Sequence, residues 1–290
     1  MATHDHIRNP VEWGWDQLKQ AGHAMGSAAH SMEGTWEARD TAPPVVRRIG
    51  LADLRDSLVQ GARDFAACRT DVIFLCLRYP LAGLIMARIA LDYGLVPLIF
   101  PLVSGFALIA PLFGVGLYEI SRRRERGIET SWKDVFGVLR SPALGSIAVL
   151  GSLLLALFAL WLFAANLLYT VTLGPNAPVS ALAFARDAVT TPQGWTMITV
   201  GIGLGFLFAL AVLVISVVSF PLLLDRDVGV ATAIRTSVHA VVQNPLPMAA
   251  WGLIIAIGLV IGTIPLLIGL AIVLPILGHA TWHLYRKVVR

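Results

Sequence analysis

Two histidines one helical turn apart are the residues of this sequence best suited to chemistry. His279 and His283 stand near the carboxyl terminus, and on a helix both imidazoles would lie on one face, where they could share a metal ion. Four other side chains of ligand type could lie at the same membrane surface: Glu119, Asp225, Asp227 and His239. Trp282 and Tyr285 flank the pair, however, and such rings commonly anchor a helix at a membrane surface. We therefore expect anchoring rather than a metal or haem site, and no resident cofactor.

Two arginines lie within the apolar segment FLCLRYPLAGLIMARIALDYG, residues 74–94. Arg78 comes early in it, and a side chain that points back toward the helix amino terminus can reach water from there. We predict that Arg78 pairs with Glu119, which ends the next apolar segment at a similar depth. Arg88 has Asp92 one turn further on as its predicted partner. The alternative role for both arginines is binding of an anionic substrate or a lipid headgroup.

The remaining motifs favour no reaction. The sequence has no glycine-rich phosphate loop, no plausible nucleophile–base set and no paired carboxylates deep in an apolar segment. The GIGLG stretch at 201–205 lies within an apolar run and indicates close helix packing. We therefore expect that the protein is not an enzyme.

Composition places the chain in a membrane. It has 290 residues, of which 57% are hydrophobic and only 14% are charged, against about 25% charged in soluble domains. A bilayer is crossed by about 20 apolar residues, and six segments meet that length approximately: 72–91, 95–120, 144–168, 195–224, 247–262 and 265–285. We predict an all-α membrane protein with six transmembrane helices and no nucleic-acid partner.

Positive charge sets the predicted orientation. The connections that would share one side of the membrane hold most of the basic residues, among them Arg47, Arg48, Arg122, Arg123, Arg124, Arg126, Arg226, Arg235, Arg286 and Lys287. Lys and Arg concentrate in cytoplasmic connections. Both termini are therefore predicted to be cytoplasmic.

Three amphipathic segments indicate internal repetition. GLADLRDSLVQGARDF, SWKDVFGVLRSP and ATAIRTSVHAVVQNP show apolar residues at steps of three and four, each directly before a span. The predicted apolar faces of the first and third hold Leu51, Leu54, Leu58, Ala62 and Phe65, and Ile234, Val238, Val241 and Val242. The predicted plan is three hairpins of spans, each preceded by a cytoplasmic amphipathic helix.

Residues 1–46 differ in composition from the rest and form a predicted unit ahead of a membrane domain at 47–290. Apolar residues of this tail alternate at steps of four and three, which is typical of a heptad seam. The stripe that would bind a partner contains Trp15, Leu18, Met25, Met32 and Trp36. Several glycines weaken this helix, so it would form by docking on a partner protein, the membrane or a second copy. A disordered tail with accidental periodicity is the alternative.

Three segments carry a resemblance to a known family: RRIGLADLRDSLVQGARDF, FPLLLDRDVGVATAIRTSVHAVVQNPLPMA and LGHATWHLYRKVV. From about residue 47 to residue 290 the chain resembles a family of predicted bacterial integral membrane proteins of unknown function. Some members of that family are labelled cytochrome c oxidase subunits. The resemblance implies a multi-pass protein of the bacterial inner membrane and brings no functional residues to this chain.

These patterns favour an accessory, scaffold or assembly factor of a membrane complex, and the resemblance suggests a respiratory one. A small-solute permease or channel-like carrier is the first alternative, with Asn166 as one of few polar residues that could line its path. A haem- or metal-binding respiratory component that uses His279 and His283 is the second. Apart from the lipid bilayer, the expected partners are a protein bound by the tail and a second copy in a homo-oligomer.

Overall fold

A computed structural model describes residues 44–76, 95–130, 141–174, 178–265 and 267–290, and the single positions 81, 85, 88, 134, 137, 138 and 176. The regular secondary structure of the described residues is helical apart from one antiparallel bridge between Val46 and Val289. The predicted tail helix lies outside these residues. Its stripe of Trp15, Leu18, Met25, Met32 and Trp36 therefore stays a prediction, as does the boundary after residue 46.

The described helices occur in a fixed order along the chain. They are α2 (Leu51–Cys76), the 3₁₀ turn η1 (Val96–Leu98), α4 (Ile99–Glu125), α5 (Leu144–Thr172), α6 (Ala181–Thr190), α7 (Pro192–Ser216), α8 (Ser219–Asp225), α9 (Val230–Gln243), α10 (Pro245–Thr263) and α11 (Leu270–Val288). Ser180 and Thr191 cap α6 and α7, since each hydroxyl accepts a hydrogen bond from an amide of the first turn. Pro192 and Pro245 begin α7 and α10, where a missing amide donor is harmless.

Four stretches of the described chain are long and apolar enough to span a membrane: Val96–Glu125, Leu144–Thr172, Pro192–Asp225 and Pro245–Thr263. The prediction of six such helices is therefore wrong. The first predicted span, 72–91, falls largely outside the described residues. The last, 265–285, forms a helix at α11 that is not among the apolar stretches. Its second half carries His279, His283 and Arg286, and it tolerates them because α2, α4 and α10 pack around it.

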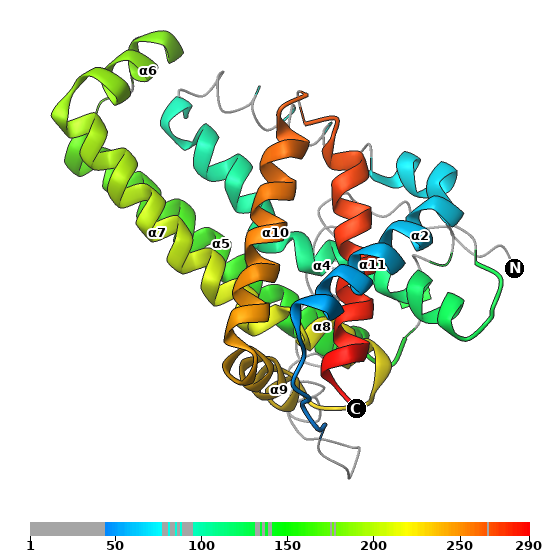
Figure 1. Cartoon of the computed structure of the whole chain (residues 1–290). Coiled ribbons are helices and arrows are strands. Elements are labelled where there is room, and N and C mark those ends of the chain that lie inside the picture. The colour runs from blue at the N-terminus through cyan, green and yellow to red at the C-terminus, as the bar shows by residue number, and fades with distance from the viewer. Residues whose placement is uncertain are drawn as a thin grey trace, which may run out of the picture.

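The helices pack into one bundle, whose arrangement Figure 1 shows. The helices α5 and α7 lie side by side and lead to α6 at one end, while α10 and α11 form an antiparallel pair. The helix α2 crosses α11, and α4 packs between α5 and α11. Buried aromatic side chains fill the interior, and the indole of Trp161 on α5 donates to the Pro101 carbonyl of α4 at 2.9 Å. This hydrogen bond joins the first two apolar stretches.

The buried face of α2 differs from the predicted apolar face. Leu51 is 56% exposed and Ala62 is also exposed, whereas Ser57, Gly61 and Asp64 are buried against the bundle. Small and polar side chains face inward because α2 crosses the polar half of α11, where the two backbones approach closely. The predicted face is therefore right only in part, because Leu54 is buried in the core and Leu58 packs against it, while Leu51 and Ala62 face outward.

The helix α9 shows the same difference. Ala233, Ser237 and Ala240 are fully buried, whereas Val238 and Val242 of the predicted apolar face are exposed. The segment expected to form the matching helix before α5 lies mostly outside the described residues, although positions 134, 137 and 138 are in 3₁₀ turns. Ile234 and Val241 of the predicted face pack against the core, so this face is also right only in part. The repeated plan of three hairpins stays a prediction.

Both ends of the described chain lie at one end of the bundle. The Arg47 amide donates to the Val288 carbonyl at 2.7 Å, and the Arg290 amide donates to the Val45 carbonyl at 3.0 Å. Asn244, between α9 and α10, bonds both an amide and a carbonyl of the segment that precedes α2. The carboxyl ends of α4, α8 and α11 meet beside α2 in the same region. We call this region the basic end.

Candidate functional site

Asp64 of α2 is the acidic residue that joins three helices at the basic end. Its Oδ2 accepts hydrogen bonds from the Ser121 hydroxyl of α4 at 2.6 Å and from His283 Nε2 of α11 at 2.8 Å. Its Oδ1 accepts one from Arg124 Nε at 2.9 Å. Burial opposes the charged form, but these hydrogen bonds outweigh it and lower the pKa of Asp64 to about 2. The ionised carboxylate therefore holds α2 against both α4 and α11.

His279, one turn before His283, extends this network into the bundle. Its side chain is fully buried, and its Nδ1 lies 2.8 Å from the Ser121 hydroxyl oxygen. Because that hydroxyl donates its proton to Asp64, its oxygen accepts from His279, so the imidazole proton lies on Nδ1. Nε2 then carries a lone pair and has no hydrogen-bond partner among the described residues. A nitrogen of this kind can accept a proton or bind a metal ion.

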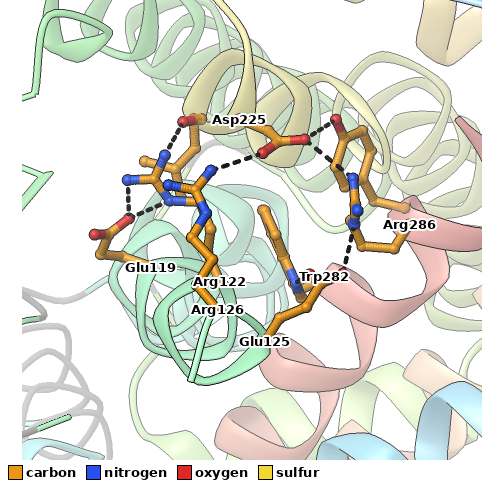
Figure 2. A network of polar contacts seen from close by, with 9 residues as sticks. Glu119, Arg122, Glu125, Arg126, Asp225, Trp282 and Arg286 are labelled. Atoms are coloured by element: carbon orange, nitrogen blue, oxygen red, sulfur yellow. Dashed lines mark hydrogen bonds and ion pairs between the residues drawn. The ribbon is translucent and has the colours of Figure 1, made fainter. Parts of the chain in front are cut away.

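A second network surrounds Asp225 at the end of α8 (Figure 2). One carboxylate oxygen accepts from the Tyr285 hydroxyl at 2.9 Å and from Arg286 Nη1 at 3.4 Å, and the other lies 3.6 Å from Arg126 Nη2. Arg286 also donates from Nε to Glu125 at 3.0 Å. The guanidinium of Arg286, on α11, thus bridges the carboxyl ends of α4 and α8.

The arginine run of α4 is held by acceptors on its own and neighbouring segments. Both oxygens of Glu119 are used, one by Arg122 Nε at 2.8 Å and the other by Arg123 Nε at 2.7 Å. Arg122 also donates to the Leu224 carbonyl at 2.9 Å, and Arg123 donates to Asp134 at 2.6 Å. These guanidinium groups therefore fix α4 against its surroundings.

An open cleft of about 350 Å³ lies beside Asp64. Its lining is made by Gln60, Asp64, Arg124, Glu125, His283, Arg286 and Lys287. Lys287 is paired with Asp53 and Asp56, and the hydrogen bond that its ammonium group donates to Asp56 raises the pKa of Lys287. The arginines and the lysine of the cleft are thus bound to acids. The cleft also leads to the chain of hydrogen bonds that runs from His283 through Asp64 to His279.

The two histidines singled out by their spacing do share one helix, but they bind different partners. His279 contacts Ser121, and His283 contacts Asp64. Asp225 belongs to the second network, and His239 is exposed on α9. Within the ranges that the structure covers, no group of three His, Cys, Asp or Glu side chains is arranged to hold a metal ion.

The two predicted arginine pairs stay predictions. Arg78 and Asp92 both lie outside the described residues. Their proposed partners are placed: Glu119 is buried in α4, and Arg88 is exposed at a helical position. Asn166, considered for a carrier path, is exposed on α5.

Asp64 was not among the candidate residues, although a signal for it is present. Ser57, Gly61 and Asp64 follow one another at steps of four and three, so they share one helix face. A face of small and polar residues is what a helix needs where it crosses a polar partner closely. An apolar pattern does not include these three residues, so it does not indicate this face.

The long apolar helices and the polar networks at one end of the bundle define the class of the molecule: it is a multi-pass α-helical integral membrane protein. Residues 99–225 match the family described as "Predicted integral membrane protein (DUF2189)". The matched segment runs from α4 to α8 and includes most of the first three apolar stretches. It is shorter than the resemblance predicted over 47–290, and its description names no activity. No curated protein and no solved structure matches the chain.

Proposed function

We propose that the protein is an accessory or scaffold subunit of a membrane complex, without a reaction of its own. The observation that supports this most is the pairing of charges at the basic end. Asp64, Glu125 and Asp225 bind basic partners across α2, α4, α8 and α11 at 2.8–3.6 Å. Fully connected polar networks fix helices relative to one another. Such rigidity suits a platform on which other subunits dock.

The proposed location is the bacterial inner membrane, with the basic end in the cytoplasm. The arginines of α4 and α11 gather at one end of the bundle and pair with the end of α8. Basic residues that flank spans are retained on the cytoplasmic side. Residues 44 and 290, which the Val46–Val289 bridge keeps close together, would then both be cytoplasmic.

A small-solute carrier is the second candidate. The hydrogen-bonded chain from His283 through Asp64 and Ser121 ends at the buried Nε2 of His279. Chains of ionisable and hydroxyl groups at membrane depth serve as proton relays in transporters. In a carrier this chain would take up a proton from the cleft.

Cross-linking in cells followed by purification of the tagged chain and mass spectrometry separates the two functions. For a scaffold we expect the same partner at fixed stoichiometry with the natural chain and with Asp56→Asn, whose side chain is half exposed. Recovery of that partner should fall with Asp64→Asn, because α2 loses its attachment to α4 and α11. A chain recovered alone contradicts the scaffold. Proton-dependent solute uptake into proteoliposomes, abolished by Asp64→Asn, establishes the carrier instead.

A further inference from the structure

The outward face of α9 is more apolar than a face in contact with water needs to be. Val242 is 71% exposed and Val238 is 36% exposed, whereas the face against the bundle holds the small residues Ala233, Ser237 and Ala240. In water this arrangement would leave the larger side chains hydrated at a cost in free energy. It suits a helix that lies in the membrane interface with its apolar side chains in the acyl boundary.

The exposed apolar band of α10 leads directly onto α9. Leu246, Leu253 and Val260 of this candidate span are 60–69% exposed, as side chains that face lipid would be. Figure 1 shows α9 at the end of α10 that begins with Pro245, next to Leu246. The apolar band therefore continues from α10 to Val242 and reaches Arg235 two turns further back on α9. A guanidinium at the edge of a lipid-facing band lies at the level of the headgroups.

The helix α2 repeats this pattern. Arg55 and Arg63 are exposed two turns apart and flank Val59, which is 40% exposed. Within the part of the chain that the structure describes, neither of them nor Arg235 has an acidic partner in an ion pair. The arginine run of α4 differs, because its guanidinium groups are bound to Glu119, Asp134 and Asp64.

We propose that the outward faces of α2 and α9 bind anionic phospholipid headgroups. Arg55, Arg63 and Arg235 contact the phosphates, while Val59 and Val242 lie in the acyl boundary below them. The arginine run at 122–124 contributes little to this binding, since its charges hold the helices together. The proposal does not depend on whether the chain is a scaffold or a carrier.

Native mass spectrometry of the full-length protein in mild detergent, titrated with phosphatidylglycerol or phosphatidylcholine, tests this inference. The natural chain should bind phosphatidylglycerol at least about tenfold more tightly, since each arginine near an anionic surface contributes about fivefold. The triple variant Arg55→Gln, Arg63→Gln, Arg235→Gln should lose most of that preference. The matched control is Arg186→Gln, which removes an exposed charge from α6 at the other end of the bundle and should bind like the natural chain.

Two outcomes would overturn the proposal. One is a triple variant that keeps the natural preference for phosphatidylglycerol, which would assign the lipid site to other cations. The other is an equal loss in Arg186→Gln, which would show a general effect of net charge. Should the triple variant fail to fold, Arg235→Gln alone must still weaken phosphatidylglycerol binding about fivefold. Arg123→Gln should instead lower the melting temperature without weakening lipid binding, because its charge is used within the protein.

Discussion

Asp64 accepts hydrogen bonds from α4 and α11 while it belongs to α2, so its loss should affect the packing of all three helices. Asp64→Asn leaves Arg124 and His283 without their buried counter-charge. We expect the free energy of unfolding in detergent to fall by about 3 kcal/mol, the usual cost of breaking a buried ion pair. Asp56→Asn, which removes an exposed acid from the same helix, should change it little. Equal effects of the two changes would contradict a special role for Asp64.

The pH dependence of stability follows from the same residue. The folded-state pKa of Asp64 is about 2, below its ordinary value of 3.8. Because this pKa is lower in the folded state, the ionised Asp64 stabilises the fold fully above about pH 4. That stabilisation is lost as the pH falls toward 2. Thermal unfolding of the natural chain should therefore show a decline over that range that is smaller in Asp64→Asn. An identical decline in both would assign the acid sensitivity to other carboxylates.

At this scale the sequence could identify residue types but not their partners. His279 and His283 were singled out because a spacing of four is a local feature of one helix. Their partners Ser121 and Asp64 lie 158 and 219 positions away along the chain. Contacts of that separation depend on how whole helices pack, which no local spacing encodes.

Among the helices, α2 and α11 cross closely enough that adding one methyl group tests their contact. A Cβ at Gly61 would lie 2.6 Å from the Ala280 backbone nitrogen, inside any allowed contact. Gly61→Ala should push α2 away and lower the free energy of unfolding by about 1–3 kcal/mol. Gly203→Ala on α7, where nothing lies within 4 Å, is the matched control and should be nearly neutral. A neutral Gly61→Ala would mean that α2 sits further from α11 than described.

Hydropathy predicted some elements well and others poorly. The predicted spans 144–168 and 247–262 correspond closely to α5 and α10, because most of the residues of each helix are apolar. The prediction for 265–285 failed as an apolar span, since protein neighbours rather than lipid surround the polar half of α11. The faces of α2 and α9 were predicted only in part: Leu54 and Ile234 pack inward as expected, whereas Val242 faces outward. Where lipid surrounds a protein, apolar residues can face outward, so hydropathy alone does not show which face is buried.

For the whole molecule, the gathering of basic residues at one end predicts the orientation of the chain. A reporter fused after Arg290, at the basic end, should be active only as a cytoplasmic reporter, because Lys and Arg residues that flank spans concentrate on that side. Alkaline phosphatase is active only after export, so activity of this enzyme fused after Arg290 would show that the orientation is the opposite one. A reporter inserted between α5 and α6, at the opposite end in Figure 1, supplies the control and should give the opposite result.

The measurement that tests the accessory function most directly compares the full chain with a deletion of residues 1–42 in native gels of mildly solubilised membranes. The described bundle begins at residue 44 and carries the four apolar stretches, so the deletion should leave expression and melting temperature nearly unchanged. The full chain should migrate with a partner, and the deletion should migrate as the chain alone, because the tail stripe with Trp15 and Trp36 is the proposed docking element. A full chain that migrates alone would contradict the account, and a deletion that collapses would show that the tail supports the bundle.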